Sequence, residues 1–356
     1  MKQAVKIRIV RYLIRMVYVS IVLFLMGVIL TGRPEFLFFM KRSEQSINII
    51  SWANIIDPQL LSSFERETGI KVYLTYYETN EELYSKLLLT DGADYDLVIA
   101  SDYVLERLIQ LSMIKKYEAK NVFAVEELHP AMRSLYCDPH DEYVLPYSWT
   151  IIGLGIDTTF FGCSPPSTWK LIFDPHFIQH YSVGMTDDFR EAILIAAQYT
   201  KGSIDSITPA VMETIVHTLK QQKSFVEMYS DSRAHELLMM RLSPVVVIST
   251  ADMHLVEGKE FLFCVPREGA FINVEGIVLP KTTHKDSYAY AFIRYMYRPE
   301  NIERGMEKYG YFSTLKTIKN TLLNGEVPEK MIPKLDFFRN VLDTERMKEV
   351  WLNILA

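Results

Sequence analysis

Three short apolar runs in the first third of the chain decide the fold: INIIS at 47–51, KVYLTY at 71–76 and DLVIA at 96–100. Each has the length and composition of a buried strand. A helix is predicted after each strand. The first begins at Asp57 and stops at Gly69, the second begins with the capping box of Thr79 and Glu82, and the third runs to Leu111. Strands that alternate with helices predict right-handed crossovers and a parallel sheet covered by helices, which is the α/β class.

The residues just after these strands are expected to line a ligand site, because open α/β sheets bind ligands beyond the carboxyl ends of their strands. They are Trp52, Tyr77 with Glu78, and Ser101 with Tyr103. An aromatic residue therefore comes after each strand. Aromatic faces with a few carboxylates suit an organic ammonium ion, since a cation over a ring gains about 0.5–2 kcal/mol. One such aromatic is more often a packing residue, whereas three at equivalent strand ends favour a binding role.

A second α/β unit is predicted after the Pro-Tyr-Ser-Trp run at 146–149, with strands at 151–156 and 181–185. The next long helix opens with Asp188 and Glu191, which lie three residues apart and share one helix face. Two neighbouring carboxylates repel unless a cation lies between them, so a bound amine would account for the pair. Capping of the helix would account for it equally well, and both interpretations stay open.

The rest of the chain continues the alternation of strands and helices. Helices are predicted at 209–222, 234–242, 287–297, 299–309 and 343–354, and a buried strand at 244–248. Two more strands, 261–265 and 271–279, are expected to pair as a hairpin, and the second carries Asn273 and Glu275.

The amino terminus has a different composition. Five cations between Lys2 and Arg15 precede seventeen uncharged residues, Met16 to Gly32. This is the pattern of a secretory signal, and the positive-inside rule places the rest of the chain outside the cytoplasm. Seventeen residues are long for a signal and short for a membrane span, and no small-x-small cleavage site comes after them. Residues 1–45 are therefore interpreted as a signal peptide or membrane anchor plus linker, and the body is expected to be periplasmic.

Composition limits the possible functions of that body. The chain has 356 residues, 38 Lys or Arg, 44 Asp or Glu and a net charge of −6. Eight of the basic residues and one acidic residue lie in 1–42. The body of the protein, residues 43–356, therefore has 30 basic and 43 acidic residues and a net charge of −13. An acidic body favours cationic ligands and is a poor candidate for binding nucleic acid. Three cysteines, Cys137, Cys163 and Cys264, allow at most one internal disulfide.

Several separated motifs together resemble the bacterial spermidine/putrescine-binding proteins. The matching runs are Ser51-Trp52, FERETGIKV at 64–72, YETN at 77–80, YDLV at 95–98, Ser101-x-Tyr103, Pro146-Tyr147-x-Trp149, TDDxRE at 186–191, PREG at 266–269 and Gly310-Tyr311. Members of this family are exported receptors of polyamine ABC importers. The resemblance implies a two-lobed periplasmic-binding-protein type II fold with a ligand cleft between the lobes. It also implies a polyamine ligand, an inner-membrane ABC permease as partner, and no cofactor, metal or catalysis.

The resemblance also implies roles for individual residues. Six positions match ligand-contacting positions of the family: Trp52, Ser101, Tyr103, Asp188, Glu191 and Glu275. Trp52 would pack on the methylene chain, Asp188 and Glu191 would hold one terminal ammonium, and Glu275 replaces an aspartate that binds an inner or second amine. Two family tryptophans are replaced at about Ser249 and Asn273, so the carboxylates are kept and much of the aromatic box is not.

The predicted lobes are based on the same resemblance. Lobe 1 is expected to comprise 46–149 and 274–312, and lobe 2 to comprise 150–273 and 313–356. The chain would cross between them near Trp149 and again near residue 273. A monomer is expected.

Other functions remain open. Because two family tryptophans are replaced, the ligand could also be another solute, such as an amino acid or a metal chelate. A cysteine enzyme on this fold would need a thiolate with a base beside it, and Cys137 with His140 is the only near pair in the sequence. A metal could be argued from His176 and His180, but no third ligand of fitting spacing accompanies them.

Overall fold

The computed structural model describes residues 15–20, 45–118, 120, 122, 125–162, 165–230, 232–322, 325–326 and 335–356. The chain divides into two units, Met1–Glu44 and Gln45–Ala356. In the first unit, residues 15–20 are helical, and the rest of the predicted signal or anchor lies outside the described residues. None of the helices in the described part of the chain combines the length and the apolar character that crossing a membrane requires.

The second unit is built on one hydrogen-bonded path of strands in the order β2-β1-β3-β10-β5-β8-β6-β7. The strands of this path are β1 (Ser46–Trp52), β2 (Lys71–Tyr77), β3 (Leu97–Ser101), β5 (Leu145–Asp157), β6 (Val183–Met185), β7 (Val226–Tyr229), β8 (Val245–Ser249) and β10 (Ala270–Pro280). Short strands pair at its sides: β4 (Ile114–Lys115) and β14 (Leu335–Phe337) with β10, and β9 (Phe261–Cys264) and β11 (Phe312–Ser313) with β5. β12 (Thr321–Leu322) and β13 (Gly325–Glu326) form a separate pair.

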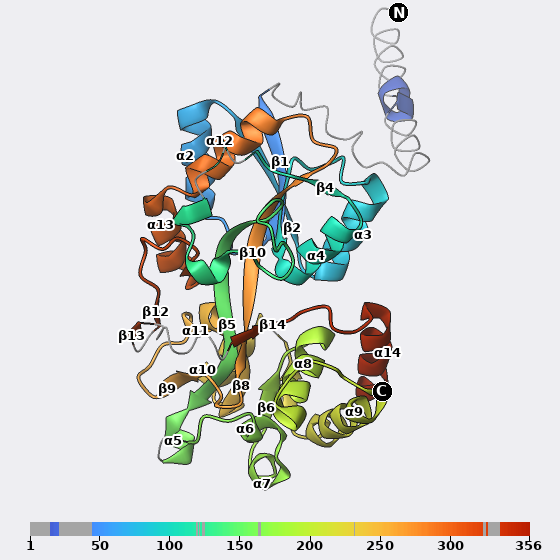
Figure 1. Cartoon of the computed structure of the whole chain (residues 1–356), viewed down its shortest axis with the longest axis vertical. Helices are drawn as coiled ribbons and strands as arrows, with labels where there is room; N and C mark the ends of the chain where they lie inside the picture. The colour runs from blue at the N-terminus through green and yellow to red at the C-terminus, as the bar shows by residue number, and fades with distance from the viewer. Residues whose placement is uncertain are drawn as a thin grey trace, which may run out of the picture. The chain divides into compact units, whose positions relative to one another are not determined.

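The first group of elements surrounds β1, β2 and β3, which run parallel as predicted. Its helices are α2 (Pro58–Thr68), α3 (Asn80–Thr90), α4 (Asp102–Gln110), α12 (Asp286–Met296) and α13 (Pro299–Tyr309). The predicted signals act as expected: Asp57 caps α2 by accepting from the backbone N–H of Gln59, and Gly69 ends it at a φ of 74°. Phe64 of α2 packs edge-on against Phe292 of α12, so the two helices cover one face of this part of the sheet (Figure 1).

The second group of elements surrounds β6, β7 and β8, which are also parallel. Its helices are α5 (Thr158–Phe161), α6 (Lys170–Phe173), α7 (Pro175–Ile178), α8 (Phe189–Lys201), α9 (Pro209–Lys223), α10 (Ala234–Met239), α11 (Thr250–Met253) and α14 (Thr344–Leu355). α8 is the central helix of this group, since every residue from Phe189 to Gln198 is buried. It packs against α9 and the carboxy-terminal α14.

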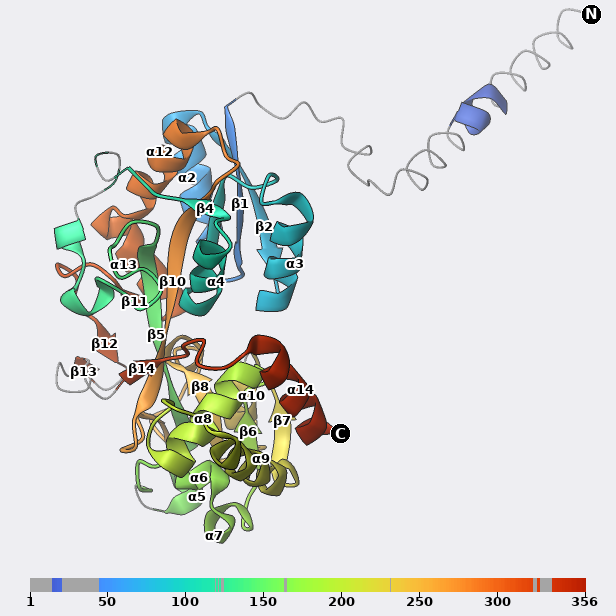
Figure 2. The ribbon, with the colours of Figure 1, turned by 45° about the vertical axis from the view of Figure 1, so that its right-hand side comes forward.

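β5 and β10 are the longest strands, with 13 and 11 residues, and they pair antiparallel from Leu145 to Ile152. Figure 2 shows both strands running between the two groups. The sequence predicts a strand only at 151–156, yet β5 already begins at Leu145 and includes the Pro-Tyr-Ser-Trp run. Because β5 and β10 belong to both groups, the strands form one connected path and not two separate sheets.

The hairpin predicted for 261–265 and 271–279 is wrong. β9 pairs with Leu154–Asp157 and β10 pairs with 145–152, both antiparallel to β5. The two strands therefore point the same way and lie one after the other along β5, which a hairpin cannot do. Alternation and length predict strands, but they do not say which partner a strand takes.

Candidate functional site

A buried carboxylate lies where β3 and β10 run side by side. Glu275 of β10 is the cross-strand partner of Ser101 at the end of β3, and the Ser101 hydroxyl donates to Glu275 Oε1 at 2.8 Å. Asn273 Nδ2 lies 3.5 Å from the same oxygen. The other oxygen, Oε2, is buried and has no hydrogen-bond donor among the described residues. The structure thus brings together two residues that lie 174 positions apart in the sequence.

Burial governs the charge of this carboxyl group. Glu275 is 7% exposed, and burial raises the pKa of its carboxyl group to about 7. The hydrogen bond from Ser101 lowers this pKa, but by less than burial raises it. Asp102 lies at the start of α4 and is 1% exposed. Burial raises the pKa of its carboxyl group, and the negative charge of Glu275 raises it further. A cation beside Oε2 would lower the pKa of Glu275 again, because an opposite charge favours the ionised carboxylate.

Two aromatic rings lie at the ends of the neighbouring strands β1 and β2. Trp52 ends β1 and is half-buried, and its ring centroid lies 4.5 Å from that of Tyr77, the last residue of β2. The Tyr77 hydroxyl donates to the backbone oxygen of Ile99 at 3.0 Å. Burial and the charge of Glu275 both raise the pKa of Tyr77. Two of the aromatic residues expected at strand ends therefore contact each other, because β1 and β2 are in register from Ser46 to Trp52.

The first turn of α8 holds the other predicted carboxylates. Asp188 is the N-cap: its Oδ1 accepts from the backbone N–H groups of Arg190 at 2.7 Å and Glu191 at 3.1 Å. Glu191 is 9% exposed, and its Oε2 accepts from the hydroxyl of Thr186 at 3.1 Å. The prediction that Asp188 caps the helix is thus confirmed. The capping hydrogen bonds use only Oδ1, one of the two carboxylate oxygens.

Tyr103 connects the two groups of elements. It is the second residue of α4 in the first group, and its hydroxyl donates to Asp188 Oδ2 of the second group at 3.2 Å. The guanidinium of Arg190 lies 4.6 Å from the centre of the Tyr103 ring. The structure therefore joins the predicted residues as two pairs, Ser101 with Glu275 and Tyr103 with Asp188.

Three residues of this region were not identified from the sequence. The amide of Asn80, at the start of α3, bonds the Tyr103 hydroxyl, and the amide of Asn340 donates to the Tyr103 backbone oxygen at 3.0 Å. Arg190 is 4% exposed and donates from Nη2 to the Thr344 hydroxyl at 3.3 Å. Its Nε and Nη1 have no acceptor among the described residues. Asn80 and Arg190 lie within the matching runs at 77–80 and 186–191, but nothing in those runs indicates the contacts that these side chains make.

The enzymatic and metal alternatives depend on one cysteine and three histidines. Cys137 is buried, and burial together with the charge of Asp102 raises the pKa of its thiol, which opposes a reactive thiolate. His140, His176 and His180 are exposed. Among the residues that the structure describes, no three His, Cys, Asp or Glu side chains are grouped so that they could hold a metal ion. Cys163 lies outside the described residues.

Comparison with known proteins gives relatives over most of the chain. The spermidine/putrescine-binding periplasmic protein of Escherichia coli is 26% identical over 279 residues, which cover 78% of this chain and 79% of that protein. The putrescine/agmatine-binding protein of Pseudomonas aeruginosa is 26% identical over 287 residues, with coverage of 76% and 78%.

Solved structures show the same fold. The crystal structure of the spermidine/putrescine ABC transporter substrate-binding protein from Streptococcus pneumoniae has a TM-score of 0.75 and 22% identity, and the match covers 87% of this chain and 98% of that one. This likeness confirms the type II fold of periplasmic binding proteins. Residues 94–339, more than half of the chain, match the sequence profile described as bacterial extracellular solute-binding protein. The protein therefore belongs to the family of bacterial extracellular solute-binding proteins.

Proposed function

We propose that this protein captures a polyamine outside the cytoplasm and delivers it to an ABC permease for import. The observation that carries the proposal is the buried Glu275 carboxylate, whose Oε2 lacks a donor among the described residues. An ammonium group would supply both the missing donor and the compensating charge. The names of the relatives, which bind spermidine, putrescine or agmatine, support the same ligand class.

The ligand is proposed to extend from Glu275 toward the first turn of α8. Trp52 would offer its ring to the methylene chain, because an alkyl-ammonium gains from an aromatic face. Asp188 and Glu191 would accept a terminal ammonium, with Ser101 and Tyr103 orienting the carboxylates they already bond. Capping does not compete with this role, since only Oδ1 of Asp188 caps the helix.

Lobe closure is proposed around the long strands. The predicted boundaries, 46–149 with 274–312 and 150–273 with 313–356, place the crossings within β5 and β10. The Tyr103–Asp188 hydrogen bond would then be a contact of the closed form, because its two residues come from different groups. Opening would break it and expose the carboxylates to solvent.

The test is calorimetric titration of the full chain with putrescine, spermidine and spermine. Glu275→Gln and the Asp188→Asn/Glu191→Gln double variant should each lose about 2–5 kcal/mol of binding free energy, the usual loss when one partner of a buried charge pair is removed. Glu257→Gln is the matched control, because Glu257 is an exposed carboxylate of the second group. Unchanged affinity in both variants would refute the site, and absence of any polyamine binding would refute the function.

Arg190 favours a second candidate ligand. Two of its buried nitrogens lack acceptors among the described residues, so a ligand that carries a carboxylate as well as an amine would satisfy both Arg190 and Glu275. An amino acid such as γ-aminobutyrate has this chemistry. Titration with γ-aminobutyrate and with putrescine under the same conditions decides between them. Tighter binding of the amino acid, lost in Arg190→Gln, would replace the polyamine proposal.

The remaining proposals concern location and assembly. We propose that the body acts as a monomer in the periplasm and that the 1–45 segment tethers it to the inner membrane. Mass spectrometry of membrane fractions tests the tether: a mature amino terminus between about residues 33 and 46 would show that the segment is a cleaved signal.

A further inference from the structure

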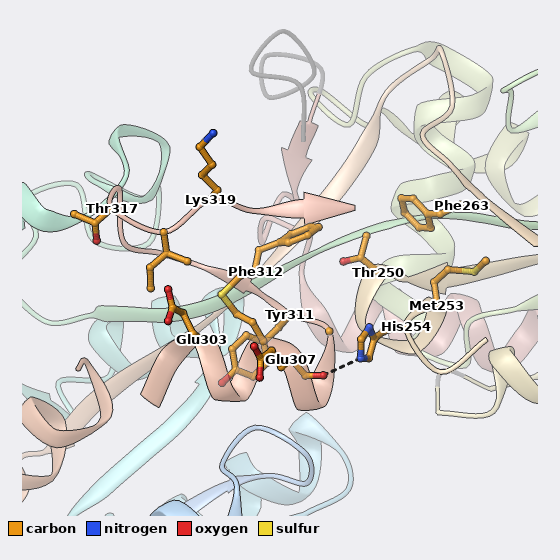
Figure 3. A pocket seen from close by; sticks show the side chains of 13 residues that line it. Thr250, Met253, His254, Phe263, Glu303, Glu307, Tyr311, Phe312, Thr317 and Lys319 are labelled. Carbon is orange, nitrogen blue, oxygen red and sulfur yellow. Dashed lines mark hydrogen bonds between the residues drawn. The ribbon is translucent and has the colours of Figure 1, made fainter. Parts of the chain in front are cut away.

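A cavity with a volume of about 840 Å³ lies apart from the candidate site. None of the six predicted site residues lines it. Its walls come from α13 of the first group and from α11 and β9 of the second, and Tyr311 and Phe312 lie between them (Figure 3). A volume of this size is typical of pockets that take small organic molecules.

The α13 side of the cavity is acidic. Glu303 and Glu307 lie one turn apart on this helix, both are exposed, and neither forms an ion pair with a described basic side chain. The carboxyl end of α13 also faces this place, because the backbone oxygen of Glu307 accepts from His254 Nε2 at 3.0 Å. A helix carboxyl end carries partial negative charge, so the helix end and both carboxylates attract a cation.

The opposite side is apolar. Met253 of α11 is buried, Phe263 of β9 is half-buried, and the buried Phe312 ring lies between Phe263 and the glutamates in Figure 3. Aromatic rings and a thioether pack favourably against alkyl groups and against another aromatic ring. The lining also holds one lysine, Lys319, so the two carboxylates outnumber the basic side chains of the lining.

We propose that this cavity is a second binding site, for an amphipathic organic monocation. Its ammonium would lie against Glu303 and Glu307, and its apolar body against Phe312, Phe263 and Met253. This site is separate from the proposed polyamine site and does not depend on it. Because its walls come from both groups of elements, an occupant would contact both at once and would stabilise their present arrangement.

The experiment is a titration of the full chain with 2-phenylethylamine, whose ammonium and phenyl ring match the two sides of the cavity. The neutral 2-phenylethanol is the matched probe without charge. Glu303→Gln/Glu307→Gln removes the acidic side, and Glu300→Gln/Glu345→Gln makes the same change in net charge at exposed positions outside the lining. Glu275→Gln reports whether the amine enters the candidate polyamine site.

We expect 2-phenylethylamine to bind the unchanged chain, the Glu300/Glu345 variant and Glu275→Gln alike, and to bind the Glu303/Glu307 variant at least about tenfold more weakly. 2-Phenylethanol should bind about tenfold more weakly than the amine to the unchanged chain. Equal binding by the Glu303/Glu307 variant, loss in Glu275→Gln, or no binding by the unchanged chain would each overturn the proposal. Polyamine binding is measured separately, so its failure would leave this result standing.

Discussion

Replacing Glu275 by Gln should change how the stability of the protein depends on pH. The wild-type carboxyl group is 7% exposed and has a pKa raised from 4.5 to about 7 by burial. Below about pH 4.5 it is protonated in both the folded and the unfolded chain. Between 4.5 and 7 the folded protein keeps a proton that the unfolded chain has lost, so the free energy of unfolding falls as the pH rises. The loss is complete above pH 7.

The size of this loss is set by the two pKa values. At about 1.4 kcal/mol per pH unit, their difference corresponds to about 3 kcal/mol. Glutamine has no proton to lose, so the difference in unfolding free energy, variant minus wild type, should rise by about 2–3 kcal/mol between pH 4.5 and pH 8. Asp102 acts in the same direction, because its raised pKa depends partly on the charge of Glu275 and should fall in the variant, so the rise should lie toward the upper figure.

Urea unfolding followed by tryptophan fluorescence, at several pH values between about 4.5 and 8, measures this difference. Glu257→Gln is again the control, and its difference from wild type should stay constant across the range. A flat difference for Glu275→Gln would refute the reasoning, because it would mean that the buried carboxyl titrates at an ordinary pKa. A saturating polyamine should reduce the wild-type pH dependence, since an ammonium beside Oε2 favours the ionised form.

Three further substitutions test local contacts, each by urea or thermal unfolding. Asp188→Ala should cost about 1 kcal/mol through loss of the α8 cap, whereas Asp188→Asn keeps a capping oxygen and should cost less. Tyr103→Phe keeps the ring but removes the hydroxyl bond to Asp188, and should cost about 1 kcal/mol; an unchanged melting temperature would show that this contact adds nothing. Gly310→Ala should cost about 2 kcal/mol or more, because φ is 70° and the added Cβ would lie 2.3 Å from His254 Cβ. Gly202→Ala, at a φ of 76° with open space around it, isolates the backbone cost, so equal losses at the two glycines would contradict the steric argument.

The sequence predicts local elements well where the signal is local. Asp57 and Gly69 bound α2 as expected, and Thr79 accepts from the backbone N–H of Glu82 at the start of α3. The second half of that capping box differs: the Glu82 carboxylate bonds the backbone N–H of Glu78 at 2.8 Å. Pairing between strands is not a local property, which is why the sequence predicts a hairpin of 261–265 and 271–279 although both strands pair with β5.

The candidate site shows the same division. Ser101 and Tyr103 could be proposed because they come directly after a strand, and Asp188 because it opens a helix. Their partners depend on the tertiary fold: only the β3–β10 register places Glu275 beside Ser101. Arg190 illustrates the limit, because a basic residue in the first turn of a helix has no local signature of a ring contact with another part of the chain.

The position of β10 has a consequence for the order of events during synthesis of the chain. β3 is buried at all five of its residues, and one of its two neighbours in the sheet is β10. Until β10 has been synthesised, β3 keeps an open edge, and the partner of Ser101 arrives 174 residues later. Contacts between such distant segments form slowly. A nascent chain therefore cannot complete the first group until the β10 segment has been made.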